Sequence, residues 1–311
     1  MDNATHACIR HRCAGSVLNG HRHRAVAQRP TSLAGPYHPA VRGESGARDL
    51  AIAVGVVIAL SRFAPDPFVW PIAIVLLAAV FLGGLQVVAE ADPAAQGVGV
   101  PVESLILPAA ASVAALGAIR LVPIGVVLVP AFVLAGGLVG LAVVTELRVA
   151  RASGPPSSTD RTAILVQIMI VGFLAFSGVA ALVPGGLPTP GQAGGGLGPD
   201  ALAVIGQAGA DAVIAFLLGY RTAALRTSNL RDVTWFGLTG AAVVAIAAVA
   251  LRSIEIPRIL GPALLVLVFF LWDAIHSGGP VRRRDPWRAW ETVLLAILAI
   301  AVIGWSVGIR G

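Results

Sequence analysis

Asp211 is the residue whose position is chemically most demanding, because it lies near the middle of the apolar stretch 201–220. An ionised carboxylate at the centre of a membrane helix costs at least about 2.5–3.5 kcal/mol, so its presence needs a reason. Gln207 stands one helical turn earlier on the same face, and Gln167 and Thr239 in other apolar stretches are candidate partners. Such a set would either couple protons or cations to a pathway, or join helices through hydrogen bonds inside the bundle.

Asp273 and His276 form a second candidate pair, since they are three residues apart and share a helical face at the end of the stretch 258–276. A carboxylate that orients an imidazole supports proton transfer near neutral pH. An interfacial ion pair is the competing interpretation, because an arginine run at 282–284 follows closely. The chain contains no Gly-rich phosphate loop, GxSxG elbow or HExxH pair, so we expect no catalytic, cofactor or metal site.

These residues belong to a chain that is 57% hydrophobic and 12% charged, with a mean hydropathy of +0.85. A soluble domain of this composition would expose large apolar patches. A helix needs about 20 mostly apolar residues to cross roughly 30 Å of hydrocarbon. The sequence therefore predicts an all-α, polytopic transmembrane helix bundle of about nine spans, with eight or ten as alternatives. The predicted spans are 47–64, 68–88, 101–119, 122–145, 162–183, 201–220, 233–251, 258–276 and 289–308.

All 22 basic residues are arginines, and their distribution predicts how the chain is oriented. Positive residues that flank spans are retained on the cytoplasmic side. With nine spans, most arginines fall in one set of alternate loops, which places the amino terminus in the cytoplasm and the carboxyl terminus outside a prokaryotic inner membrane. We assign orientation and contact with anionic lipid headgroups to six of these residues. They are Arg221, Arg226, Arg231, Arg282, Arg283 and Arg284.

The net charge of +6 does not indicate nucleic-acid binding, because the arginines are spread over short loops and line no single basic domain. The first 46 residues differ from the rest, since they hold five of the six histidines, both cysteines and no apolar run. We expect a disordered basic tail over 1–46 and the helix bundle over 47–311. The spacing of Cys8 and Cys13 is not a usual zinc pattern. An alternative interpretation is that the tail is not part of the natural product.

Three function classes are compatible with this pattern. The polar residues inside spans favour a permease-like protein for a small solute or ion, which would use Asp211 and Gln207. The alternative is a non-catalytic membrane subunit or scaffold, whose partners would be other membrane subunits beside the lipid bilayer. A membrane-embedded lipid or glycan transferase ranks third, because the chain lacks a sizeable interfacial loop with clustered acids, histidines or metal ligands. An enzyme is thus the less favoured class.

Cysteine labelling tests the predicted orientation. In a chain with Cys8 and Cys13 replaced by serine, we expect Arg226→Cys and Arg283→Cys to react with a membrane-impermeant maleimide from the cytoplasmic face only, because both loops belong to the arginine-rich set. Gly194→Cys, in a loop of the opposite set, serves as the control and should react from the outside. Labelling of positions 226 and 283 from opposite faces would contradict the predicted topology.

Overall fold

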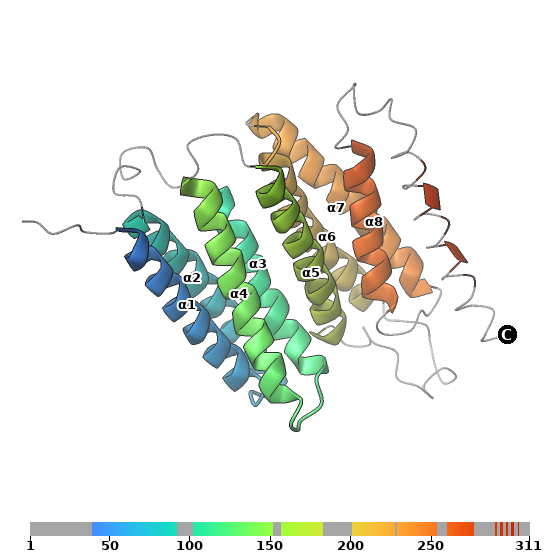
Figure 1. The fold of residues 1–311 in the computed structure, drawn as a ribbon. Helices are drawn as coiled ribbons and strands as arrows, with labels where there is room; N and C mark the ends of the chain where they lie inside the picture. The colour runs from blue at the N-terminus through green and yellow to red at the C-terminus, as the bar shows by residue number, and fades with distance from the viewer. Residues whose placement is uncertain are drawn as a thin grey trace, which may run out of the picture. The chain divides into compact units, whose positions relative to one another are not determined.

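The computed structural model describes residues 39–91, 102–151, 157–182, 201–227, 229–253 and 260–276, and single positions between 290 and 304. All regular elements within these ranges are helices (Figure 1). The predicted tail over 1–46 lies mostly outside the described residues, although the first helix begins within it. The elements are α1 (Pro39–Ser61), α2 (Asp66–Ala91), α3 (Glu103–Ala118), the short 3-10 helix η2 (Ile119–Leu121), α4 (Leu128–Arg151), α5 (Ser158–Leu182), α6 (Ala201–Ala224), α7 (Leu230–Ser253) and α8 (Leu260–His276).

Six of the described helices are long and apolar enough to cross a membrane. They are the apolar parts of α2 to α7, while α8 is apolar but shorter, at 17 residues. α1 is not among the six, since Arg48 and Asp49 lie next to its apolar half. The prediction of an all-helical chain with several apolar, membrane-type helices is therefore confirmed. The count of nine stays a prediction, because only single positions of the range 289–308 are described.

The fourth predicted span, 122–145, is displaced relative to the helix that the structure contains. α4 begins at Leu128 and continues to Arg151, so that Glu146 lies inside the helix. The chain leaves the preceding helical turn at Val122, which has extended backbone angles (φ −78°, ψ 127°). The apolar residues that follow form the connection between the helices, and an apolar connection cannot be distinguished from a span by hydropathy alone.

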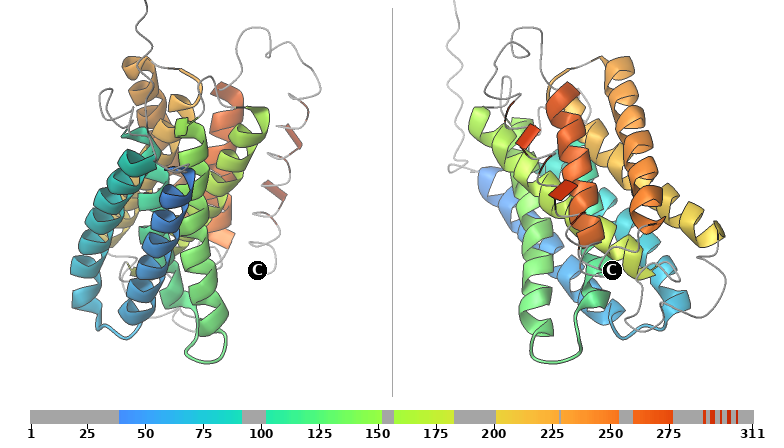
Figure 2. Two further views of the ribbon diagram at one scale, coloured as in Figure 1. Left: turned by 60° about the vertical axis from the view of Figure 1, so that its left-hand side comes forward. Right: turned by 90° about the vertical axis from the view of Figure 1, so that its right-hand side faces the viewer.

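The helices form two adjoining groups of four (Figures 1 and 2). In the front group, α1 to α4, each helix packs against the next and α4 returns to α1. The rear group, α5 to α8, closes in the same way, with α8 packed against α5. The groups meet chiefly where α3 packs against α5 and α6. Each helix runs opposite to the one before it in this up-and-down arrangement, so alternate helices share a direction (Figure 1).

The described helices have an apolar core and also an apolar exterior, unlike a soluble protein. Large apolar side chains such as Ile74, Leu134 and Ile246 are exposed, whereas several polar and charged ones are buried. Lipid solvates apolar side chains and offers no hydrogen-bond partner to polar ones, so this distribution fits a bundle surrounded by a membrane. The buried polar residues in the described part of the chain are Ser61, Ser104, Ser112, Thr145, Glu146, Gln167, Ser177, Asp211, Arg221, Thr222 and Asp273.

Glycines bring helices together at two crossings. A Cβ atom added to Gly117 of α3 would lie 2.7 Å from the Cα atom of Gly178 of α5, so the two backbones touch. In the front group, a Cβ on Gly136 would lie 3.5 Å from the Cα of Gly55, and one on Gly140 would lie 3.0 Å from the Cβ of Ala51. Close approach through small residues spaced by four is the usual packing mode of helices in lipid.

Two arginines tie the turns of the front group to each other. The Nη2 atom of Arg62 donates to the carbonyl oxygen of Val122 (3.3 Å), across the α1–α2 and α3–α4 connections. Arg120 donates in the opposite direction, to the carbonyl oxygens of Ser61 (3.3 Å) and Ala64 (3.4 Å). These bonds add side-chain donors to carbonyls at and just beyond the helix ends, where the regular helical bonding stops. Arg62 and Arg120 therefore have a structural role, and both lie in the set of loops that contains few arginines.

The Gly117–Gly178 contact leads us to expect a loss of stability when a side chain is added there. Gly117→Ala should lower the free energy of unfolding by about 1–3 kcal/mol, because its Cβ meets backbone atoms that cannot rotate away. Gly137→Ala is the matched control, since nothing lies within 4 Å of the added atom and its stability should be unchanged or slightly raised. Thermal unfolding in detergent measures both variants. Equal behaviour of the two would show that α3 and α5 do not cross at Gly117.

Candidate functional site

Asp211 lies close to the middle of α6 and is fully buried, with 0% of its surface exposed. Among the described residues, neither of its carboxylate oxygens has a hydrogen-bond partner. A buried polar group without a partner is rare in native proteins and calls for an explanation, and a buried unpaired charge is costlier still. Asp211 is therefore the least satisfied ionisable group that the described part of the chain contains within an apolar helix.

The buried face of α6 has polar residues on both sides of Asp211. Gln207, Asp211, Ala215, Leu218 and Thr222 follow one another at spacings of three or four, which places them along one face of the helix. The last four of these are fully buried. The Asp211 carboxylate thus lies on the helix face that packs into the bundle, with polar groups towards both helix ends.

Arg252, in the last turn of α7, donates from Nη1 to the Oε1 atom of Gln207. This contact joins α6 and α7 about one helical turn from Asp211. The sequence predicts Gln207 as a companion of Asp211 because the two share a face, whereas the structure shows its polar contact to the neighbouring helix. Arg252 is not among the predicted site residues, since it directly follows a predicted span.

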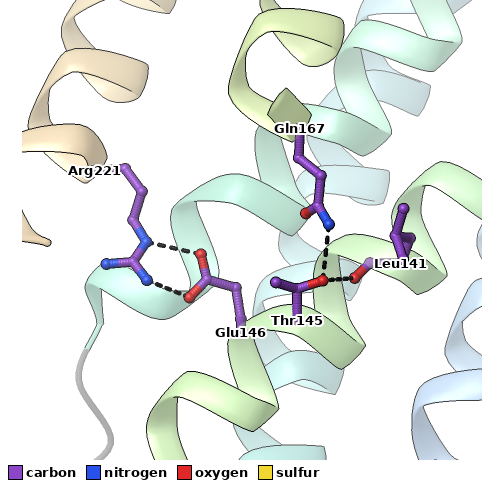
Figure 3. Close-up of polar contacts among 5 residues, drawn as sticks. All are labelled: Leu141, Thr145, Glu146, Gln167 and Arg221. Atoms are coloured by element: carbon purple, nitrogen blue, oxygen red, sulfur yellow. Dashed lines mark hydrogen bonds and ion pairs between the residues drawn. The ribbon is translucent and has the colours of Figure 1, made fainter. Parts of the chain in front are cut away.

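Glu146 and Arg221 form a buried ion pair between the front and rear groups (Figure 3). The guanidinium of Arg221 binds the carboxylate with two bonds, from Nε to Oε1 (2.7 Å) and from Nη2 to Oε2. Both side chains are nearly inaccessible to solvent. Arg221 lies in the last turn of α6, where the helix dipole favours a cation. Such a bidentate geometry is the strongest way to pair two buried charges.

Thr145 and Gln167 form a second polar contact beside this pair (Figure 3). The Nε2 atom of Gln167 in α5 donates to Oγ1 of Thr145 in α4 (2.8 Å). The threonine hydroxyl in turn donates to the carbonyl oxygen of Leu141 (2.7 Å). Gln167 therefore contacts the helix that carries Glu146, so it joins the front and rear groups and is not a hydrogen-bond partner of Asp211.

Asp273 pairs with an arginine of the α6–α7 connection. Its Oδ2 atom accepts a hydrogen bond from Nη2 of Arg226 (2.7 Å), and the guanidinium carbon of Arg226 lies 5.9 Å from the centre of the Phe236 ring. His276 is exposed; its ring nitrogen Nδ1 lies 3.0 Å from the carbonyl oxygen of Trp272, and its ring contacts the indole. The described contacts include no hydrogen bond between Asp273 and His276, so the two face different partners.

The remaining predicted residues occupy simpler positions. Thr239 donates to carbonyl oxygens of its own helix, at Trp235 (2.8 Å) and Phe236 (3.1 Å), which satisfies its hydroxyl locally. Arg231 is exposed in the first turn of α7, as contact with lipid headgroups or water requires. Arg221, in contrast, is buried in its ion pair and is not available to headgroups. The arginines at 282–284 lie outside the described residues.

Glu146, like Arg252, is not among the site residues predicted from the sequence. The predicted fourth span ends at position 145, which places this carboxylate in a loop. A carboxylate that directly follows an apolar run, while an arginine ends another run, is a pattern that would have suggested the pair. Among the described residues, no three His, Cys, Asp or Glu side chains gather as a metal site.

Comparisons with protein-family models, with curated proteins and with solved structures find no match. The class of the protein therefore follows from its own fold and side chains. Several apolar helices, apolar side chains on the outside and polar pairs between helices fit a multi-pass membrane protein.

The ion pair predicts a large effect on stability. Glu146→Gln should destabilise the fold by about 3–5 kcal/mol, because Arg221 keeps a buried charge without its counter-ion. Asp160→Gln is the control, since its carboxylate lies in an exposed hydrogen bond at the start of α5 and should cost less than about 1 kcal/mol. Unfolding by a denaturing detergent measures both. A loss below about 1 kcal/mol for Glu146→Gln would contradict the pairing.

Proposed function

We propose that this protein is permease-like and moves a small solute or ion across the membrane, with Asp211 as the group that binds a proton or cation on the way. The observation that carries the proposal is the Asp211 carboxylate itself, buried within an apolar helix and without a hydrogen-bond partner among the described residues. Intramembrane ionisable residues in helical proteins usually mark ion pathways or proton relays.

The chemistry of a lone buried carboxylate restricts the coupling species. In a medium of low dielectric constant, a carboxylate is tolerated when it takes up a proton or binds a cation that offsets its charge. Release of that proton or cation requires water or another acceptor to reach the group. A residue with these two states suits a transport cycle, in which binding and release alternate.

The polar contacts on α6 support the proposal by their positions. Gln207 and Arg252 lie towards one end of the helix, and Arg221 and Glu146 lie towards the other. Asp211 lies between them, about one turn from Gln207 and about 15 Å from Arg221 along the helix axis. A route along this face would meet polar groups at both entrances and an ionisable group near its middle.

A non-catalytic membrane subunit is the second candidate, and the complete burial of Asp211 is the observation that favours it. In that role the residue would join helices through a hydrogen bond. The described neighbours supply no such bond, which is why we rank the subunit role below transport. The described residues give no support to a lipid or glycan transferase, the third class.

Flux through proteoliposomes tests the transport role. With protein in vesicles that contain a pH-sensitive dye for protons or a Na⁺-sensitive dye for Na⁺, a valinomycin-imposed potential should drive uptake of the coupling cation. Asp211→Asn should abolish coupled flux, because an amide neither binds nor releases a proton. Asp49→Asn, an exposed carboxylate of α1, is the matched control and should keep the flux. Normal flux in Asp211→Asn would show that this residue is not part of the pathway. The subunit role would be favoured if the unaltered protein gives no flux and co-purifies with a stoichiometric partner.

A further inference from the structure

The contacts between the front and rear groups differ at their two ends. Gly117 and Gly178 lie near the carboxyl ends of α3 and α5, and their backbones touch directly. Glu146 and Arg221 lie near the carboxyl ends of α4 and α6, which run opposite to α3 and α5. The glycine contact and the ion pair are therefore at opposite ends of the bundle. Along α5, Gly178 and Gln167 are separated by about 16 Å.

The two ends are also joined by different kinds of contact. Where Gly117 meets Gly178, no side chain separates the two backbones, so this direct contact of α3 and α5 can serve as a pivot. At the opposite end, α4 and α6 are not among the closely packed pairs of the described helices. They are linked by the long side chains of Glu146 and Arg221, with the Gln167–Thr145 hydrogen bond beside them.

A buried ion pair is broken as a unit, and its two charges tolerate separation only where water reaches both of them. Tightly packed helices, in contrast, lose all their contacts when they part. Since α4 and α6 are joined mainly through this pair, the two helices can separate at the ion-pair end once the pair breaks. An opening there would lead along the buried face of α6 towards Ala215 and Asp211, which are both fully buried in this structure.

We infer that the front and rear groups rock about the Gly117–Gly178 contact, and that the Glu146–Arg221 pair is the latch that closes the predicted cytoplasmic end. This inference rests on the proposed function, because the route that the latch closes leads to Asp211. The latch separates Asp211 from the cytoplasm in this structure, and its release admits water and solute to the carboxylate from that side. Domain movements about small residues, held by interface ion pairs, are a known form of switching transition.

A buried cysteine reports this opening without any need for flux. In a chain with Cys8 and Cys13 replaced by serine, Ala215→Cys places a thiol one turn from Asp211 on the buried face. A membrane-impermeant maleimide is added to inverted membrane vesicles, which present the cytoplasmic face. Labelling should be slow with the latch intact and about tenfold faster when Glu146→Gln is added, since the closed arrangement loses its main link.

Arg226→Gln is the matched control for this experiment. This substitution also breaks an ion pair, but the Arg226–Asp273 pair lies wholly within the rear group. Labelling of Ala215→Cys should therefore stay slow. Exchange of the charges, Glu146→Arg with Arg221→Glu, should restore slow labelling. If Glu146→Gln does not fold, Glu146→Gln with Arg221→Gln leaves no unpaired charge and takes its place in the test.

Two results would overturn the latch. One is unchanged slow labelling in a folded Glu146→Gln or double-glutamine variant. The other is equal acceleration by Arg226→Gln, which would show general loosening of the helices. Neither result depends on transport. If Asp211→Asn does not alter flux, the latch is still supported by the labelling experiment. If the labelling experiment contradicts the latch, the role of Asp211 is still tested by the flux experiment.

Discussion

The main constraint on this structure is that lipid supplies no hydrogen-bond partner, so each polar group within a helix must find one inside the protein. Small hydroxyl side chains meet it locally, as Ser112 does by donating to the carbonyl oxygen of Ala109 (2.8 Å). Longer polar side chains must reach another helix, and they become the links between helices. Glu146 with Arg221 and Gln167 with Thr145 are such links, and both connect the front group to the rear group.

The helices could be predicted from the sequence because each depends on its own residues. A run of about 20 apolar residues forms a helix in lipid whatever its neighbours are. Eight of the predicted ranges accordingly overlap α1 to α8. Pro65, Asp66 and Pro67 are typical turn residues and follow α1, whereas the apolar connection before α4 has no such signal and resembles a span. Gly136 and Gly140 are spaced by four, a pattern that places both on one helix face and is typical of helix packing in lipid.

The partners of the polar residues could not be predicted, because they depend on which helices lie side by side. Hydropathy places Asp211, Gln207 and Gln167 at membrane depth, but it does not say that Gln167 faces α4 or that Gln207 faces Arg252. The pairing of Glu146 with Arg221 joins residues 75 positions apart across the two groups. Such a contact follows from the fold as a whole. The sequence indicates only that the two residues carry opposite charges and lie at or near the ends of apolar runs.

The contrast between two carboxylates argues for different roles. Glu146 and Asp211 are both buried in apolar helices, yet Glu146 has a bidentate arginine and Asp211 has no hydrogen-bond partner among the described residues. Arg252 binds Gln207, which lies one helical turn from Asp211. A carboxylate that served only to hold helices together would gain from such an arginine, as Glu146 does. Without one, Asp211 can be neutralised by a proton or a cation from outside the fold, and a group that depends on an exchangeable partner is suited to binding and release.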